Sequence, residues 1–429
     1  MKALRTLTCA AALGLALTAH ADWPDYRGPT GNGLAPDDVR AAHLPLRWSE
    51  TENVRWKTPI SHRGWSSPVV MDGRVWLTTA TTKGTEFFAI CVEAATGKVL
   101  HYRRLFQCEN PEPLGNDVNS YASPSPVIEA GRVYLHFGSY GTACLDAETG
   151  EELWRRHGLP CRHFRGPGSS PVLVGDRLIL TMDGVDVQYL VALDKRTGKT
   201  VWRTERSADW NDLDANGQPT DGGDLRKAFS TPLLVTVAGQ AQLLSAGAKA
   251  AYGYDPATGQ ELWKIRHTGF SVALRPVFGH GLAFLSSGFG KTELFAIRAD
   301  GRGDVTQSHV AWKTGRGVPR MPSPLLKDDL LFLLGDSGVM TCLEARTGKE
   351  VWQERLGGEH VASPVCAGDR IYCFSQDGRA AVVKADRSFE VLARNKLEDG
   401  LMASPAILDK ALILRTKTHL YRIESAKTP

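Results

Sequence analysis

Short apolar runs separated by turn residues extend along most of this chain. Residues 170–180 show the pattern: a Ser-Pro step opens an apolar run, Gly175 and Asp176 interrupt it, and a second apolar run follows. Runs this short, bounded by Gly, Pro and Asp, predict β-strands joined by tight hairpin turns. The 43 Gly, 23 Pro and 11 Trp agree with a folded chain that is dense in turns rather than helical.

The hairpin pattern recurs as an internal repeat. Segments 147–154 and 255–263 both run from an acidic stretch through Thr-Gly to Trp. A glycine at that point suits a tight turn that needs positive φ. The Thr-Gly pairs are Thr96-Gly97, Thr149-Gly150, Thr197-Gly198, Thr258-Gly259 and Thr347-Gly348, and Asp300-Gly301 takes the equivalent place once.

A second recurring element is a Ser-Pro, Thr-Pro or Arg-Pro step ahead of each turn. Its eight prolines are Pro68, Pro126, Pro171, Pro232, Pro276, Pro324, Pro364 and Pro405. Each unit then contains four strands: A at the proline step, B after a turn, C before the Thr-Gly pair, and D after it. Four short antiparallel strands in eight copies predict an all-β fold, an eight-bladed β-propeller of four-stranded antiparallel blades.

The eighth unit ends at Ile423 after strands A, B and C, without a D strand. Residues 53–57 carry Trp56 at the same distance before Pro68 as Trp312 stands before Pro324. We therefore expect this N-terminal strand to complete the last blade and close the ring, which removes free sheet edges. The expected division is a signal peptide (1–21), an N-terminal extension (22–52) and a single propeller domain (53–429).

A large side chain stands at the same place in most D strands. The tryptophans concerned are Trp56, Trp154, Trp202, Trp263, Trp312 and Trp352, and Leu100 stands nearby in the first unit. We expect these indoles to be structural, packing as flat slabs between neighbouring blades rather than stacking on a ligand.

The best copies of the repeat, A-x-D-x-x-T-G-x-x-x-W, resemble the PQQ-binding-like (quinoprotein-type) β-propeller family from about Trp48 to Tyr421. The resemblance is greatest to secreted bacterial members whose mature chains begin much like residues 22–29. It implies the fold strongly and the chemistry weakly. Quinoprotein alcohol dehydrogenases of this family carry two adjacent cysteines and a calcium-bound centre, and no adjacent Cys pair occurs here. An outer-membrane assembly lipoprotein of the family is a protein-docking scaffold, but it keeps a lipid-anchoring cysteine that this chain lacks.

The N-terminus has the pattern of an export signal. Lys2 and Arg5 precede an apolar run over residues 7–18, and Ala19-His20-Ala21 fits the small-x-small cleavage pattern. The run is too short to span a membrane. We expect cleavage after Ala21, a periplasmic or secreted protein, and no transmembrane segment.

Net charge bears on the expected binding partners, and cysteine content bears on the expected disulfides. The formal net charge of +4 is too weak to gather phosphate backbones, so nucleic acid is not an expected partner. Seven cysteines remain after cleavage, and no C-x-x-C is present. Those that precede Thr-Gly turns, such as Cys144 and Cys342, suit a packing role. Cys108 with Cys161 is the disulfide pairing to test first.

Loop lengths predict which end of the propeller binds a ligand. The connections from Leu100 to Pro126, Trp154 to Pro171, and Trp202 to Pro232 are longer than the others, and they join D to A strands at one end. The six residues before each proline step should border the channel there. They suggest a cationic funnel with aromatic side chains, made of His62, Arg63, Trp65, Tyr121, Arg165, Arg226, Lys227, Phe229, Arg275, Arg320 and His360. Such a funnel suits a carboxylate, sulfate or phosphate, but these cations could equally pair with loop acids or face water.

The longest insertion contains a partial calcium-loop pattern in Asp212, Asp214 and Asn216. The position where a bidentate acid should stand is Gly223, so a solvated polar loop explains the composition as well. Calcium and PQQ are both possible cofactors, and no site residue firmly supports either.

Two classes of function remain open. The first is a monomeric, non-catalytic module that binds a small anionic ligand or acts as a scaffold for a protein partner. The second is an enzyme in the funnel, either a degenerate quinoprotein oxidoreductase or a hydrolase or lyase acting on an anionic carbohydrate. Asp183, Asp186 and Asp336 follow B strands and are the candidate bases for the second class.

Overall fold

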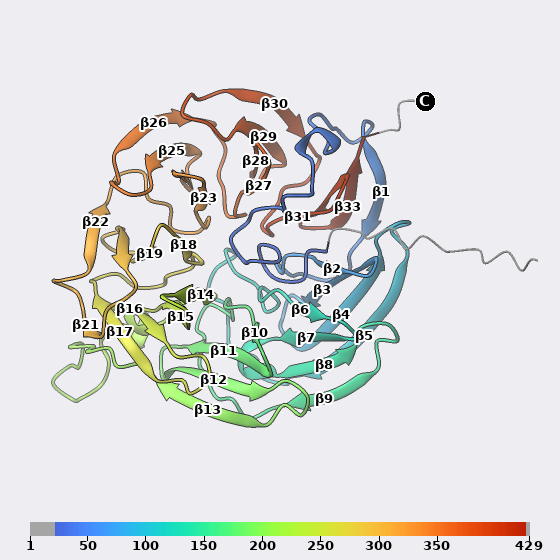
Figure 1. Cartoon of the computed structure of the whole chain (residues 1–429). Coiled ribbons are helices and arrows are strands. Elements are labelled where there is room, and N and C mark those ends of the chain that lie inside the picture. The colour runs from blue at the N-terminus through green and yellow to red at the C-terminus, as the bar shows by residue number, and fades with distance from the viewer. Residues whose placement is uncertain (1–21, 426–429) are drawn as a thin grey trace, which may run out of the picture.

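The computed structural model describes residues 22–425, which form eight β-sheets arranged as a ring around a central axis (Figure 1). This confirms the predicted eight-bladed propeller. The described residues also contain three short 3-10 helices: η1 (Ala41–His43) in the N-terminal extension, and η2 (Gly138–Tyr140) and η3 (Thr220–Arg226) in connections between strands. The expected signal peptide, residues 1–21, lies outside the described residues. The part of the chain that the structure describes contains no helix that is long and apolar enough to cross a membrane.

The blades are numbered in chain order, and each follows the predicted A to D strand order. Blade 1 contains β2 (Val69–Met71), β3 (Arg74–Ala80), β4 (Glu86–Glu93) and β5 (Val99–Gln107). Blade 2 contains β6 (Val127–Glu129), β7 (Arg132–His136), β8 (Thr142–Asp146) and β9 (Glu152–Arg156). Blade 3 contains β10 (Val172–Val174), β11 (Arg177–Asp183), β12 (Gln188–Asp194) and β13 (Thr200–Glu205). Blade 4 contains β14 (Leu233–Val237), β15 (Gln240–Ala246), β16 (Ala250–Tyr254) and β17 (Glu261–Arg266).

The second half of the ring repeats this plan. Blade 5 contains β18 (Val277–Gly279), β19 (Leu282–Ser286), β20 (Leu294–Arg298) and β22 (Val310–Thr314). Blade 6 contains β23 (Leu325–Lys327), β24 (Leu330–Leu334), β25 (Val339–Glu344) and β26 (Glu350–Arg355). Blade 7 contains β27 (Val365–Ala367), β28 (Arg370–Phe374), β29 (Arg379–Lys384) and β30 (Val391–Lys396). Blade 8 contains β31 (Ala406–Ile407), β32 (Ala411–Arg415), β33 (His419–Glu424) and β1 (Val54–Pro59).

Blade 4 departs from the four-stranded pattern. A fifth strand, β21 (Gly303–Asp304), pairs in parallel with the outer strand β17, with Trp263 opposite Gly303. It comes from the connection between β20 and β22 of blade 5, which has Asp300-Gly301 where the other units have Thr-Gly. That longer connection reaches back to cover the neighbouring blade, and the repeat pattern does not predict it.

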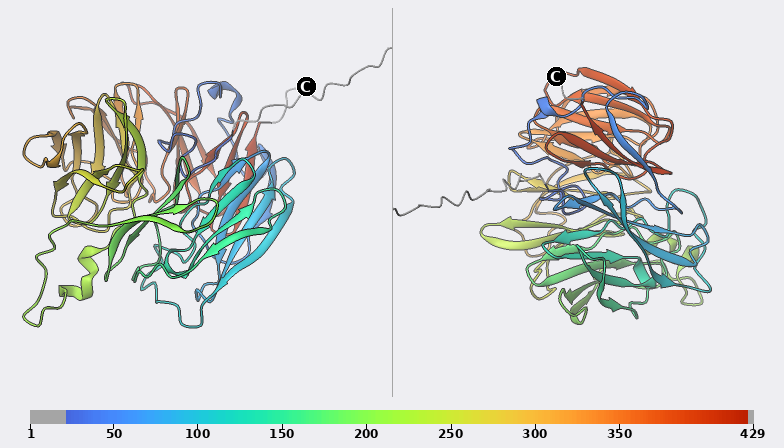
Figure 2. Two further views of the ribbon diagram at one scale, coloured as in Figure 1. Left: turned by 60° about the horizontal axis from the view of Figure 1, so that its bottom comes forward. Right: turned by 90° about the vertical axis from the view of Figure 1, so that its right-hand side faces the viewer.

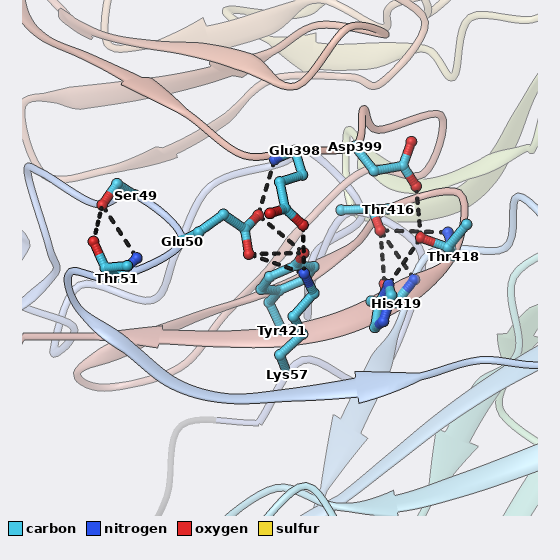
Figure 3. Close-up of polar contacts among 10 residues, drawn as sticks. All are labelled: Ser49, Glu50, Thr51, Lys57, Glu398, Asp399, Thr416, Thr418, His419 and Tyr421. Atoms are coloured by element: carbon cyan, nitrogen blue, oxygen red, sulfur yellow. Dashed lines mark hydrogen bonds and ion pairs between the residues drawn. The ribbon is translucent and has the colours of Figure 1, made fainter.

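The ring closes through pairing of the first and last strands. β1 runs antiparallel to β33, with Lys57 opposite Tyr421. Polar contacts reinforce the junction (Figure 3): Lys57 Nζ lies 3.0 Å from Glu50 Oε2 and 2.9 Å from Glu398 Oε2, and the Tyr421 hydroxyl donates to Glu50 Oε1 at 3.1 Å. The sequence-based expectation that the N-terminal strand completes blade 8 is confirmed.

Inner strands are buried and outer strands are partly exposed, which explains the two sequence patterns. β11 and β12 are buried over nearly their whole length because blades cover them on both faces, whereas β13 is mostly exposed. The apolar side chains form clusters between adjacent blades, such as the one that joins residues of blades 1 and 2. The hydrophobic core is therefore divided among the interfaces around the ring.

Tryptophans in the outer strands connect one blade to the next. Trp154 Nε1 of blade 2 donates to the Lys195 carbonyl of blade 3 at 3.0 Å, and its ring lies where a Cβ on Gly198 would stand. The same kind of bond runs from Trp56 to Ala94, Trp202 to Pro256, Trp312 to Ala345 and Trp352 to Asp386.

Two outer strands fill this position differently. In blade 1 the side chain over the next turn is His101, not Leu100, and its Nε2 lies 2.8 Å from the Glu148 carbonyl. In blade 4 the indole of Trp263 donates to Gln242 Oε1 of its own blade at 3.0 Å and is fully buried.

Candidate functional site

A cavity of about 420 Å³ occupies the centre of the ring. Every blade contributes to the cavity wall the residue three positions before its repeat proline, the proline of the Ser-Pro, Thr-Pro or Arg-Pro step. These residues are Trp65, Ser123, Gly168, Phe229, Ala273, Met321, Val361 and Met402, and we call them the inner ring. A repeat unit places the same backbone position at the axis eight times, so one residue of each unit faces the channel. Most of this ring is apolar.

Hydroxyl groups form a second ring next to the first, at the residue directly before seven of the eight repeat prolines. The backbone N–H of Ser67 donates to Ser125 Oγ at 2.8 Å, and the N–H of Ser125 donates to Ser170 Oγ at 2.9 Å. Equivalent bonds run from Ser170 to Thr231, Arg275 to Ser323, Ser323 to Ser363, Ser363 to Ser404 and Ser404 to Ser67. These hydrogen bonds link the blades around the axis and satisfy buried backbone donors.

Arg275 interrupts the hydroxyl ring because it has no hydroxyl to offer the amide of Thr231. Its guanidinium instead binds the N-terminal extension: it donates to Asp25 Oδ2 at 2.9 Å and also to the Tyr26 carbonyl. The arginine is 1% exposed, so this ion pair is buried. The single exception to the hydroxyl pattern is therefore an anchor for a different segment.

The N-terminal extension covers the lower end of the channel. Trp23 pairs through its backbone with Val70 of β2, and Leu34 bridges to Cys366 of β27. Figure 1 shows this segment, in dark blue, lying across the inner ends of blades near the axis. Tyr26 lies between these points, reaches the cavity, and has its hydroxyl 3.2 Å from Ser363 Oγ. Tyr26 thus forms part of the cavity floor.

The three long insertions meet at the opposite, upper end, as their lengths predicted. The first contributes Asn116, Val118 and Asn119 to the cavity, the second Arg165, and the third Asp224 and Lys227. The third insertion projects well beyond the blades in the left view of Figure 2. Phe270 and Phe289 also lie at this rim. The mouth is more polar than the inner ring because the insertions bring Asn, Arg, Asp and Lys side chains to it.

The two rim cations differ in their pairing. Lys227 is 3% exposed; its Nζ donates to the Asp224 carboxylate and, at 2.9 Å, to the Asp224 carbonyl. Burial lowers the pKa of Lys227, although the contact with Asp224 acts in the opposite direction. Arg165 lies over the Phe164 ring at 4.6 Å, and among the described residues no carboxylate comes within 4.0 Å of it. Among the described residues that line the cavity, Arg165 is therefore the one cation without a carboxylate partner.

Only four of the residues expected in a cationic funnel line the cavity: Trp65, Arg165, Lys227 and Phe229. The other seven lie elsewhere, so the funnel predicted from the sequence is too broad. His62 is exposed and stacks on Phe88 with ring centroids 4.9 Å apart. Arg63 forms an ion pair with Asp117 at 2.9 Å.

The remaining residues of that set have structural partners or face solvent. The Tyr121 hydroxyl donates to the Glu112 carbonyl at 2.7 Å, and both nitrogens of buried His360 contact backbone carbonyls. Arg226 pairs with Asp212, and Arg275 with Asp25. Arg320 is exposed, with its guanidinium 5.5 Å from the Phe289 ring centroid, and it does not line the cavity.

In the partial calcium loop, the carboxylate oxygens of Asp212 and Asp214 accept hydrogen bonds from protein groups. Both Asp212 carboxylate oxygens accept hydrogen bonds from Arg226, at 2.9 and 2.5 Å. Asp214 Oδ1 accepts the backbone N–H groups of Asn216 and Gln218, which is a local turn. The described residues contain no group of three or more His, Cys, Asp or Glu side chains placed to hold a metal ion.

The three candidate bases also have protein partners outside the cavity. Asp183 forms a buried ion pair with Arg206, with Nη2 2.8 Å from Oδ2. Asp186 accepts the backbone N–H groups of Arg162 and Val187. Asp336 accepts those of Arg320 and Met321, and burial raises its pKa. None of the three is among the residues that line the cavity.

The expected disulfide between Cys108 and Cys161 is absent, because both thiols are free in the structure. Cys161 belongs to the apolar cluster between blades 2 and 3, and its Sγ lies 3.6 Å from His163 Nδ1. Cys108 packs in a different cluster, between blades 1 and 2. Burial raises the pKa of the Cys144 and Cys342 thiols to about 12, in keeping with cysteines that pack as small apolar side chains.

Most of the cavity wall is not predicted from the sequence. Among the six residues before each proline, cations and aromatic rings were the predicted lining, but the wall also contains Ala273, Met321, Val361 and Met402. The signal was available in the spacing, since the third residue before each proline lines the cavity in all eight blades. Tyr26 gave no such signal, because it lies outside the repeats.

Fold and cavity together define a β-propeller with a central cavity, which the N-terminal extension borders at one end. The sequence model of one family, described as "Outer membrane protein assembly factor BamB", matches residues 49–226, 186–303 and 248–388. The chain belongs to this family of PQQ-like β-propellers.

Individual relatives are distant. The chain is 21% identical over 322 residues to the outer membrane protein assembly factor BamB of Shewanella oneidensis, a match that covers 70% of this chain and 74% of that protein. The crystal structure of BamB from Moraxella catarrhalis superposes with a TM-score of 0.58 at 12% identity, over 86% of this chain and 99% of that one. A europium-containing methanol dehydrogenase superposes with a TM-score of 0.65 at 12% identity, over 93% and 88% of the two chains. The structural likenesses show the fold alone.

The cavity does not fit the cofactor that gives the fold its name. Pyrroloquinoline quinone carries three carboxylates, and in the dehydrogenases it binds together with calcium. The lining here offers two cations, Arg165 and Lys227, and Lys227 is already paired with Asp224, the one carboxylate of the lining. A tricarboxylate with a divalent cation would need more positive side chains and a set of free carboxylate ligands.

Proposed function

We propose that this protein is an exported, non-catalytic propeller that binds a partner protein at the insertion-loop end of the channel. The carrying observation is that all three long insertions converge on that end, where two of them expose apolar side chains. Val118 of the first insertion is 47% exposed, and Leu213 of the third is 62% exposed. Apolar side chains held out by loops on a rigid ring suit a contact surface.

Three further points support this proposal. The matched family is described as an outer membrane protein assembly factor, a role carried out among other proteins. The N-terminal pattern ending at Ala21 predicts export, which would place the chain in the same compartment. The candidate bases are occupied by ion pairs or backbone amides, and the one carboxylate of the cavity is paired with Lys227.

Site-specific photocrosslinking tests where a partner binds. We would place p-benzoylphenylalanine at Val118 and, as a matched control, at Leu153, which is 46% exposed on the outer edge of blade 2. We expect a discrete protein adduct from position 118 in intact cells of the source organism, and none from position 153. Adducts from position 153 alone, or from neither position, would contradict the proposal.

A second measurement tests the non-catalytic part. Purified protein would be incubated with PQQ and calcium, then with alcohol and a redox dye. We expect neither a new absorbance nor dye reduction. Alcohol-dependent reduction would favour the oxidoreductase.

A further inference from the structure

The central cavity itself has features that identify a class of small ligand. Its volume of about 420 Å³ falls within the range of small-molecule sites. Aromatic rings come from four separate segments around it: Trp65 and Phe229 in the inner ring, Phe270 and Phe289 at the rim. Flat apolar rings on several sides favour a flat apolar molecule that can stack or make edge contacts with them.

The charge at the mouth of the cavity indicates which charge the ligand carries. Lys227 is neutralised by Asp224, which leaves Arg165 as the cation available to an anion. The Arg165 guanidinium is held in position, because it lies over the Phe164 ring and its Nη1 stands 2.5 Å from where a Cβ on Gly115 would be. A planar guanidinium fixed at the edge of an apolar cavity matches one carboxylate or sulfonate group.

The closed floor fixes the orientation. Tyr26 and hydroxyl-ring residues such as Ser125 and Thr231 line the lower part, so a ligand enters from the insertion-loop end. Its apolar body would sit within the inner ring, and its anionic group would stay at the rim beside Arg165. This arrangement keeps the charge near water while the rings exclude water from the body of the molecule.

We propose that the cavity binds an aromatic monoanion, with its rings inside the inner ring and its carboxylate or sulfonate on Arg165. This deepens the proposed binding function by naming a ligand class, and it does not require the partner protein to occupy the cavity.

The test uses 2-naphthoate and its neutral counterpart 2-naphthamide, with binding to the purified protein measured by calorimetry. The variants are Arg165→Met and, as a control, Arg320→Met, an exposed rim-side arginine that does not line the cavity. We expect Arg165→Met to weaken 2-naphthoate binding at least about tenfold, as for loss of a hydrogen bond to a charged group. Arg320→Met should change it less than about twofold. The amide should bind the original protein and Arg165→Met equally.

A cavity-filling variant separates this site from binding elsewhere on the surface. Ala273→Leu adds bulk to the inner ring and should abolish binding of both probes, with circular dichroism and melting used to confirm that the propeller is folded. The proposal is overturned if neither probe binds, if the amide binds the original protein as tightly as the acid, or if Ala273→Leu binds both normally. Photocrosslinking from Val118 is independent of these results, so the two proposals can fail separately.

Discussion

At the scale of single residues, the repeated indoles are the most direct link between sequence and stability. Trp154 is 8% exposed and joins blade 2 to blade 3 through its ring and its Nε1–H. Gly198 beneath it has φ of 70°, so it meets two demands at once: the turn needs positive φ, and the ring leaves no room for a Cβ. The pair explains why Trp and Thr-Gly recur together in the sequence.

We expect Trp154→Ala to lower the free energy of unfolding by about 3 kcal/mol, because it leaves a cavity between two blades and removes the bond to Lys195. The neighbouring Leu153 is 46% exposed on the same strand. Leu153→Ala should change stability by less than about 0.5 kcal/mol. Urea unfolding of the two variants makes the comparison, and equal losses would refute the structural role of the indole.

Two buried histidines predict how stability changes with pH. Burial lowers the pKa of His136 to about 3 and that of His163 to about 4. Both are neutral in the folded protein, and the backbone N–H of Ser139 donates to His163 Nε2. The unfolded chain takes up protons below about pH 6.5, so this contribution is complete above that pH and is lost as the pH falls toward 4.

We therefore expect a smaller loss of stability between pH 7 and pH 5 in His136→Asn than in the original protein, by about 2 kcal/mol. Asparagine can keep a hydrogen bond to Thr142, which lies 2.8 Å from His136 Nδ1. Urea unfolding at the two pH values gives the difference. An identical pH dependence would show that His136 does not titrate on unfolding.

At the scale of elements, the N-terminal extension depends on Arg275. Arg275→Ser would restore the hydroxyl pattern of the ring but leave the Asp25 carboxylate buried without its partner. We expect the extension to detach and trypsin to cleave after Arg27, which is 0% exposed in the intact protein. Mass spectrometry of the digest measures this.

The control for that variant is Arg320→Ser, since Arg320 is exposed and its guanidinium lies over the Phe289 ring. Asp25→Asn combined with Arg275→Ser should be cleaved more slowly than Arg275→Ser alone, because the neutral amide at position 25 needs no charged partner. Equal protection in all three variants would mean that other contacts hold the extension.

The elements also show how far the sequence could predict this molecule. Strand order, blade number and ring closure follow from the spacing of Pro, Gly and Trp, because each depends on local turn chemistry repeated eight times. Which cations form ion pairs cannot be predicted in the same way. Arg226 and Arg165 both precede a proline step, and they differ only in the tertiary contacts that each one makes. Arg226 meets Asp212 across a long insertion, and Arg165 meets no acid among the described residues.

At the scale of the whole molecule, stability depends on closing the ring. Deleting residues 22–59 would remove β1 and expose the edge of β33, a row of unpaired backbone groups that invites pairing with another chain. We expect this variant to self-associate, as measured by light scattering after size exclusion. Deleting only residues 22–52 retains β1 and should leave the assembly state of the intact chain unchanged. A long deletion that behaves like the short one would show that blade 8 is stable with three strands.

Pairing of β1 with β33 also determines the order in which the blades can fold. During synthesis β1 is made long before β33, its neighbour in the sheet, so Trp56 and Lys57 have no strand partner until Tyr421 has been added. Blades 1 to 7 can assemble in chain order as synthesis proceeds, but blade 8 needs β1 and β33 to be present together. The ring is therefore closed only after β33 has been made.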